Sequence, residues 1–354
     1  MEAASVTPGA PSRRRSEAVR EFISQYGLIA ILLILPVAYG IQDLSETGNL
    51  NRLGNNLVEG ISNGAILALI ALGYTLVYGI IELINFAHGE VFMLGSLTAA
   101  ALYTPFGLTP NTSTAGLVLG LGAILIISML ASGSLNVMIE RVAYRPLRSA
   151  PKLAPLITAV GMSFVLQNVG ILWIGASQVA IPDLLGSQKH LFEVWGITVT
   201  RGHVLAIAVT IPLVILLTSF VGRSRLGKAM RATAQDPEAA RLMGINVDTT
   251  ISLTFLLGGL MAGAAGLISA LYQTSIWYFQ GFSAGLYAFT AAVMGGIGNI
   301  RGAVLGGVII GIIQGISDNR IGNDWTPAIV FVYLVIIMVF RPQGLIGEET
   351  REAG

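Results

Sequence analysis

The sequence predicts an all-α fold, a polytopic transmembrane helical bundle of about ten spans. Three observations support this prediction. Hydrophobic residues make up 54% of the 354 residues and charged residues only 11%, whereas a soluble domain carries about 25% charged residues. Apolar runs of roughly the length that crosses a bilayer recur along the chain. The 43 glycines suit a membrane bundle, in which small residues let helix backbones approach closely.

The candidate spans are the apolar runs bounded by polar turns. They cover residues 27–41, 57–80, 89–103, 115–138, 153–175, 203–221, 249–272, 283–299, 301–317 and 326–340. No small-residue cleavage site follows the first run, so we interpret it as a retained span and not as a signal peptide. For the run at 283–299, a full crossing and a re-entrant segment both stay open. The domain prediction is an N-terminal extension (1–26), a membrane domain (27–345) and a C-terminal tail (346–354).

The positions of Lys and Arg predict the orientation of the chain. Sixteen of the 20 basic residues lie in the two tails, in the loops 139–152 and 222–248, and at Arg301. The other side keeps Arg52, Lys189, Arg201 and Arg320. Because cytoplasmic loops carry an excess of Lys and Arg, the sequence predicts an inner-membrane protein with both termini in the cytoplasm.

The external segment 176–202 mixes large apolar residues, among them Trp195, with polar ones. Tryptophan is favoured at the membrane interface, so we expect a partly ordered cap there. Two interpretations stay open for this cap. It is either a docking surface for an external protein or an interfacial loop without a partner.

The sequence also argues against several classes of function. The net charge of +1 is spread between apolar spans and indicates no nucleic-acid partner. Without cysteine, the chain has no disulfide and no thiol chemistry. The histidines, His88, His190 and His203, have no metal-ligand spacing. No Gly-rich loop ends in Gly-Lys-Ser/Thr, so any ATP that drives this protein is bound by another subunit.

The loop 222–248 is the longest predicted cytoplasmic loop, and its residues predict two short helices. Asp236 and Pro237 form a good helix start, with Asp as the N-cap and Pro at the first helical position. Glu238 lies in the first turn, where the helix dipole favours an anion. Gly244 is suited to end the helix in the left-handed conformation. These stop and start signals favour a rigid helix over a solvated basic loop.

Several stretches carry a family resemblance. Glu238-Ala239-Ala240-Arg-Leu-Met-Gly244 resembles the Glu-Ala-Ala-x-x-x-Gly coupling motif of ABC importer permeases. Residues 67–90, the loop Ile139-Glu-Arg-Val-Ala-Tyr-Arg-Pro-Leu-Arg148, residues 288–307 and the ending Arg341-Pro-Gln-Gly344 resemble the LivH-type permease of branched-chain amino-acid ABC transporters. The resemblance covers roughly residues 55–345 and departs at the N-terminus, which looks like an extension.

The resemblance implies a heteromeric importer. Its other parts are a second, related permease, two cytoplasmic ATPase subunits that bind ATP and Mg, and an external substrate-binding protein. The implied substrates are leucine, isoleucine or valine; urea and short amides are the alternative, because their importers share the architecture. The short helix would dock into a groove on an ATPase through Asp236, Pro237, Glu238, Ala239, Ala240 and Gly244.

Polar residues within or near the spans are candidates for a path or gate, because ionisable groups at membrane depth are costly and usually functional. They are Glu59, Asn63, Tyr74, Asn85, His88, Glu90, Gln167, Asn168 and Gln273. The alternative role is structural, since buried amides most often bridge helices and polar turns cap helix ends. A stand-alone secondary transporter is a rival prediction. Such proteins often have internal repeats and midplane acidic residues, and the sequence shows neither clearly.

Overall fold

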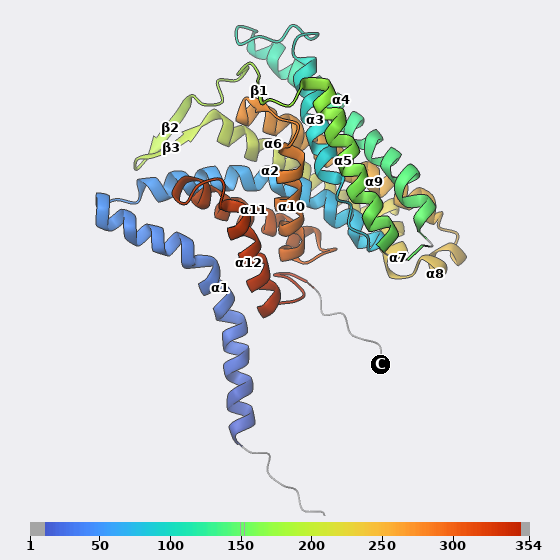
Figure 1. Ribbon diagram of the computed structural model, residues 1–354, viewed down its shortest axis with the longest axis horizontal. Coiled ribbons are helices and arrows are strands. Elements are labelled where there is room, and N and C mark those ends of the chain that lie inside the picture. The colour runs from blue at the N-terminus through green and yellow to red at the C-terminus, as the bar shows by residue number, and fades with distance from the viewer. Residues whose placement is uncertain (1–10, 149, 152, 348–354) are drawn as a thin grey trace, which may run out of the picture.

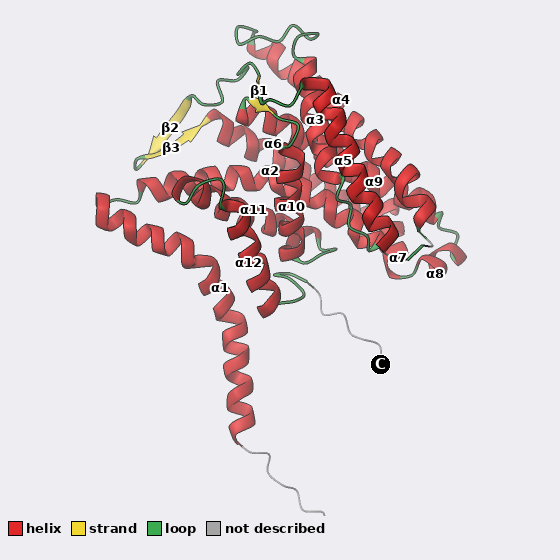
Figure 2. Ribbon diagram, in the orientation of Figure 1, coloured by secondary structure: helices red, strands yellow, loops and turns green. Residues whose placement is uncertain are grey.

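We describe the protein from a computed structural model, which covers residues 11–148, 150–151 and 153–347. This part of the chain is mainly helical (Figures 1 and 2). Its α-helices are α1 (Pro11–Thr47), α2 (Asn51–Ile81), α3 (His88–Leu102), α4 (Thr114–Ile139), α5 (Leu153–Ile174), α6 (Arg201–Arg223), α7 (Arg225–Gln235), α8 (Pro237–Leu242), α9 (Val247–Gln273), α10 (Gln280–Gly295), α11 (Ile300–Arg320) and α12 (Thr326–Phe340).

Each predicted span overlaps one helix. Within the described residues, six helices are long and apolar enough to cross a membrane: α2, α4 with the turns that extend it, α5, α6, α9 and α11. Helix α12 is apolar but has only 15 residues. The fold is therefore that of a helical membrane protein, as predicted. The number of ten crossings stays a prediction, because α1, α3 and α10 are not among the six.

Glycines hold the centre of the bundle together. Helices α2 and α11 pack so closely that a Cβ on Gly64 would lie 2.8 Å from the Cα of Val308. A Cβ on Gly311 would lie 2.2 Å from the Cα of Gly64. Close packing of this kind replaces the hydrophobic driving force that helices lack in lipid. As a result α2, α9 and α11 are the most buried of the six long helices.

The two halves of the chain pack in a corresponding way. Helix α9 lies against α4, where Gly259 and Gly263 approach the backbone of Ser132 and Ser128, much as α2 lies against α11. The glycines Gly73 of α2 and Gly258 of α9 meet where these two helices cross. The order α2–α3–α4 thus matches α9–α10–α11. This internal correspondence was not visible in the sequence.

Helices α3 and α10 are short and are reached through non-helical backbone. Helix α2 ends at Glu82 with φ 50°, and α9 ends at Thr274 with φ 53°. The 15 residues of α3 extend about 22 Å, less than the about 30 Å of a hydrocarbon core. The His88 ring lies against Gly73, two turns before α2 ends. Helix α3 therefore begins inside the bundle.

The predicted span 283–299 corresponds to α10, but its end is wrong. The helix stops at Gly295, and Gly296 and Gly298 follow with φ 109° and 88°. Asn299 then caps α11 by accepting hydrogen bonds from the backbone N–H groups of Arg301 and Gly302. These positive φ angles favour glycine, so the chain reverses tightly where the apolar run had suggested a continuous helix.

The all-α prediction misses two small antiparallel ladders on one side of the bundle (Figure 2). Strands β2 (His190–Val194) and β3 (Ile197–Thr200) form a hairpin, and β1 (Val179–Ala180) pairs with β4 (Ser275–Ile276). Trp195 and Gly196 make the hairpin turn with φ 52° and 76°, the positive values that a two-residue hairpin loop requires. The segment 176–202 is therefore ordered, as expected for a cap, but through strands.

Helix α1 begins at Pro11 and continues through the predicted boundary at residue 27. Its N-terminal part projects away from the bundle (Figure 1). Near its other end, the buried Asp43 carboxylate accepts hydrogen bonds from Arg320 of α11 at 2.6 Å and from the backbone N–H of Leu53 at 2.9 Å. Residues 1–10 of the predicted extension and 348–354 of the predicted tail lie outside the described residues.

Candidate coupling and translocation sites

The two short helices predicted in the loop 222–248 are confirmed as α7 and α8. The Asp236 carboxylate accepts hydrogen bonds from the backbone N–H groups of Glu238 and Ala239, both at 2.9 Å. Pro237 is the first residue of α8. Gly244 has φ 81°, so it ends this segment in the left-handed region, as predicted. Asn246 then caps α9 by accepting from the N–H of Thr249 at 3.0 Å.

The exposed face of α8 differs in part from the prediction. Glu238 and Ala239 are exposed, but Ala240 is only 4% exposed and belongs to the chain's own core. Ala240 thus packs inside the protein, and its part in a docking contact stays a prediction. Two residues that the sequence analysis missed, Leu242 and Met243, are 89% and 83% exposed at the end of the helix. The signal was present, since two adjacent large apolar residues in a polar loop are unusual.

An ion-pair cluster fixes the start of α9 beside α8. Asp248 accepts a hydrogen bond from Arg145 at 2.9 Å and one from Arg148 at 2.6 Å. Arg148 also pairs with the buried Glu140, which accepts from Ser252 at 2.6 Å. Glu140 begins a π-helical turn (Glu140–Tyr144) at the end of α4, followed by a 3₁₀ turn (Arg145–Leu147). The cluster thus joins the α4–α5 connection to the helix that follows α8.

The predicted path residues fall into separate places. Asn63 and Gln273 meet at a cavity of about 200 Å³ between α2, α9, α10 and α11. Its lining combines amides, hydroxyls and aromatic rings, and the residues not predicted as path residues include Phe92, Trp277, Gln280, Tyr287 and Gln314. The Gln280 amide donates to the Ser96 hydroxyl at the edge of this space. The cavity offers hydrogen bonds within an otherwise apolar bundle.

Asn85, His88 and Tyr74 lie in a buried cluster at the start of α3. Asn85 donates to the Asn136 side chain at 3.2 Å, and Asn136 donates to the Phe255 carbonyl at 2.6 Å. The Tyr144 hydroxyl donates to Asn85, also at 3.2 Å. His88 packs edge-on against the Tyr74 ring, with centroids 4.9 Å apart. For Asn85 these contacts match the structural alternative, an amide that bridges helices.

Glu90 is fully buried where α3, α5 and α10 meet. Its Oε1 accepts hydrogen bonds from Gln167 at 2.9 Å and Ser163 at 3.1 Å. Its Oε2 has no hydrogen-bond partner and would lie 2.4 Å from a Cβ on Gly281. Helices α3 and α10 touch here, since a Cβ on Gly89 would lie 2.3 Å from the Gly281 carbonyl oxygen. The structure therefore joins Glu90 and Gln167, two of the predicted path residues, by a hydrogen bond.

An apolar cavity of about 190 Å³ lies beside this carboxylate. Its lining includes Ser163 and Gly285, together with Tyr74, Phe86, Val160, Phe164, Phe282, Leu286 and Phe289. Two predicted path residues lie elsewhere. Asn168 is exposed and donates to the Phe164 carbonyl of its own helix at 2.8 Å. Glu59 accepts from Asn319 of α11 at 2.8 Å and lies apart from both cavities.

Comparison with known proteins agrees with this arrangement. Residues 56–339 match the family model described as the branched-chain amino acid transport system / permease component. The chain is 41% identical to the high-affinity branched-chain amino acid transport system permease protein BraD of Pseudomonas aeruginosa, and 39% identical to the corresponding LivH of Escherichia coli. Both comparisons cover 82% of this chain and 94% of the relative. A probable LivH of Methanocaldococcus jannaschii is 27% identical over 86% of this chain and 96% of its own.

The family match begins at residue 56, after α1, so the departure expected at the N-terminus agrees with it. The match includes α8, both cavities and Glu90, all of which lie between residues 56 and 339. It also covers more than half of the chain. The chain therefore belongs to the family of permease components of branched-chain amino acid transport systems.

Proposed function

We propose that this chain is a transmembrane permease subunit of an ABC importer for branched-chain amino acids. In this proposal it pairs with a second, related permease. Two cytoplasmic ATPase subunits bind ATP and Mg, and an external binding protein delivers the substrate. The permease catalyses no reaction itself and alternates between outward and inward access. Family membership supports the substrate class, because the relatives above are named for branched-chain amino acids.

Helix α8 is the observation that carries the proposal. It is capped at both ends, lies outside the long apolar helices and presents the exposed Leu242 and Met243. Large exposed apolar residues of this kind mark interaction sites in soluble surroundings. If a partner bound α8 and changed conformation, the motion would reach α9 through the short link 243–246. The Asp248 ion pairs would pass the same motion to Arg145 and Arg148 in the α4–α5 connection.

The two cavities support a route for a zwitterion with an apolar side chain. The amides Asn63, Gln273 and Gln314 line the first cavity and suit the charged ends of an amino acid. The aromatic residues of the second cavity suit a branched hydrocarbon side chain. The short helices α3 and α10 meet between them at Gly89 and Gly281. Discontinuous helices at a bilayer midplane commonly form transport sites.

The hairpin β2–β3 is the proposed docking surface for the external binding protein. Trp195 is 90% exposed at its tip, and Leu191, Phe192 and Val194 are exposed along it. Tryptophan is enriched among the residues that dominate protein interfaces. The hairpin is anchored to α2 close to its turn, where the Asn55 side chain accepts from the backbone N–H of Thr198 at 2.7 Å.

Two features of the structure are compatible with the rival prediction, a stand-alone secondary transporter. The halves of the chain correspond in packing, and Glu90 is a buried acidic residue. The family match and α8 still favour the ABC importer, because a stand-alone transporter has no need of a helix that docks an ATPase. Urea and short amides stay alternative substrates, but they lack the branched side chain that the aromatic cavity suits.

Reconstitution tests the proposal. The complete complex in vesicles, with its binding protein, is expected to accumulate leucine, isoleucine or valine only when ATP is present on the ATPase side. Urea and acetamide serve as competing substrates in the same assay. Uptake by the permease pair alone, driven by an ion gradient, would favour the secondary transporter. ATP-dependent uptake of urea without uptake of amino acids would overturn the substrate class and leave the ABC assignment intact.

A further inference from the structure

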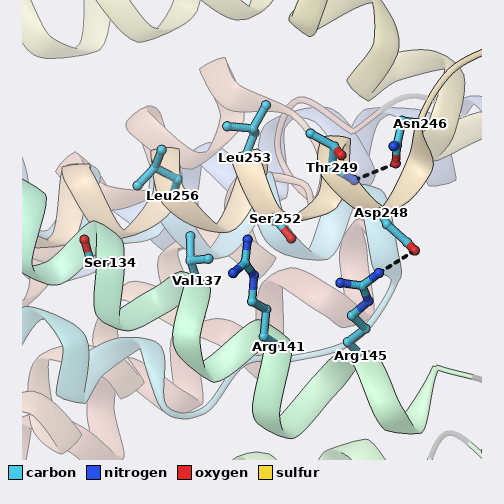
Figure 3. Close-up of a pocket in the computed structure, with 10 residues that line it drawn as sticks. All are labelled: Ser134, Val137, Arg141, Arg145, Asn246, Asp248, Thr249, Ser252, Leu253 and Leu256. Carbon is cyan, nitrogen blue, oxygen red and sulfur yellow. Dashed lines mark hydrogen bonds and ion pairs between the residues drawn. The ribbon is translucent and has the colours of Figure 1, made fainter.

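A groove of about 480 Å³ lies between α4 and α9 (Figure 3), at the start of α9, which follows α8 in the chain. Helix α4 and its extension contribute Ser134, Val137, Arg141 and Arg145 to its walls. Helix α9 and its cap contribute Asn246, Asp248, Thr249, Ser252, Leu253 and Leu256. The groove is separate from both cavities of the proposed transport route, which lie between other helices.

One of the basic side chains in and beside the groove has no acidic partner in the part of the chain that the structure describes. Asp248 is matched by Arg145 and Arg148, and Glu140 behind it is matched by Arg148. Arg141 is exposed and forms no ion pair or hydrogen bond within the described residues. Figure 3 shows its side chain extending from α4 into the groove toward α9. The hydroxyls of Ser134 and Thr249 lie elsewhere on the same walls.

The rest of the groove is apolar and leads onto an apolar surface. Val137, Leu253 and Leu256 form its remaining walls. The outer face of α4 continues this surface away from Arg141 with the exposed side chains of Leu119, Ile126, Leu130 and Met138. A free anion in water would gain nothing from this surface. An amphiphile with an anionic head would use both parts, because basic pockets between transmembrane helices near a membrane surface bind lipid headgroups.

We propose that this groove binds an anionic phospholipid, with its headgroup phosphate at Arg141 and its acyl chains along the outer face of α4. Arg141 supplies the charge, and the paired Arg145 and Asp248 form the fixed wall beside the headgroup. The site adjoins α9, which directly follows α8, the helix proposed to dock on the ATPase. Bound lipid would therefore brace α4 against α9 at the point where motion of α8 enters the bundle.

Lipid binding to the purified complete transporter tests the proposal. The probes are spin-labelled phosphatidylglycerol and phosphatidylcholine in nanodiscs, with inorganic phosphate as competitor. The wild type is expected to retain an immobilised fraction of phosphatidylglycerol over phosphatidylcholine. Arg141→Gln is expected to weaken this preference by at least about fivefold, since one basic residue near a membrane surface contributes about 1 kcal/mol. Arg141→Lys keeps the charge and should retain most of the preference.

Arg223→Gln is the matched control, because Arg223 is also exposed but lies outside the groove. Equal lipid preference in the wild type and Arg141→Gln would overturn the proposal. So would displacement of the lipid by inorganic phosphate, which would indicate a site for small anions. Loss of the companion permease from Arg141→Gln with unchanged lipid binding would show that the groove is a protein interface. The wild-type comparison of the two lipids stands even if a variant fails to assemble.

Discussion

The buried polar residues of this bundle form two groups. Some have hydrogen-bond partners on neighbouring helices for their polar atoms, and others keep a polar atom without a partner among the described residues. Asn85 and Asn136 share donors and acceptors with each other and with α9, so they bridge helices. Glu90 keeps one carboxylate oxygen without a partner. The sequence predicted Asn85 and Glu90 as candidates from their position. It could not show which of them has all its hydrogen bonds filled, since the partners Asn136 and Ser163 come from helices distant in the chain.

Replacement of Glu90 tests its role in transport. Glu90→Gln keeps the shape and one oxygen for Ser163 and Gln167, so the complex should assemble. We expect transport to fall by at least roughly tenfold, because a hydrogen bond to a charged group is worth about 1.5–3 kcal/mol. The measurement is uptake by reconstituted vesicles, with Asn168→Ala as a control at an exposed site. Full transport by Glu90→Gln in assembled complexes would show that the carboxylate only packs the helices.

The Asp43–Arg320 pair gives a prediction for stability. The Arg320 hydrogen bond holds the pKa of the Asp43 carboxyl below its usual value, although burial acts in the opposite direction. Asp43→Asn removes the negative charge that pairs with Arg320 and should lower the free energy of unfolding by about 3 kcal/mol. Because the folded pKa is lowered, the pair's contribution is complete above the unfolded value of about 3.9 and is lost as pH falls through the folded pKa.

Thermal unfolding in detergent at several pH values measures this difference. Glu46→Gln is the control, since its pair with Arg52 is exposed at 3.6 Å and should contribute less than about 1 kcal/mol. An Asp43→Asn variant as stable as the wild type near neutral pH would contradict the prediction.

At the scale of single elements, helix ends were predicted best where the backbone itself needs a particular residue. Asp236, Pro237 and Gly244 mark α8 because capping and positive φ are local requirements. The burial of Ala240 is not local. It depends on how α8 rests on the bundle, which the sequence around Ala240 does not show. The hairpin β2–β3 was missed for a similar reason, because its five-residue strand is exposed along its length.

The exposed tip of α8 gives the first prediction at this scale. The double change Leu242→Ser and Met243→Ser should weaken ATPase binding by at least tenfold, because each large apolar side chain contributes about 1.5–3 kcal/mol when buried. Ala240→Trp should instead destabilise the permease by about 1–3 kcal/mol through overpacking. Co-purification of the ATPases and substrate-stimulated ATP hydrolysis measure the first effect. Gln235→Ala, exposed at the end of α7, is the control, and wild-type ATPase binding by the double variant would exclude this contact.

The hairpin tip gives the second prediction at this scale. Trp195→Ser removes the most exposed aromatic residue of the cap and should reduce stimulation of ATP hydrolysis by the loaded binding protein, while basal hydrolysis stays unchanged. Trp325→Ser is a control, since Trp325 is also well exposed but lies between α11 and α12. Equal stimulation of both variants and the wild type would favour the interpretation of the cap as a loop without a partner.

At the scale of the whole molecule, the sequence predicted where helices lie but not how the halves correspond. The helix of each predicted span could be located from an apolar run, because the length of such a run is a property of consecutive residues in the sequence. The correspondence of α2–α3–α4 with α9–α10–α11 depends on close approaches of small residues, such as Gly73 on Gly258. Glycine is frequent throughout the chain, so these meeting points do not stand out in the sequence.

The orientation of the molecule is the last prediction. The bias of Lys and Arg predicts that both termini and α8 lie in the cytoplasm and that the hairpin lies outside. The chain has no cysteine, so Trp195→Cys and Glu238→Cys give one reactive thiol each, at exposed positions that the prediction places on opposite sides of the membrane. A membrane-impermeant maleimide should label Trp195→Cys in intact spheroplasts and Glu238→Cys only after permeabilisation. Labelling of Glu238→Cys from outside would reverse the orientation and remove α8 from the reach of any cytoplasmic ATPase.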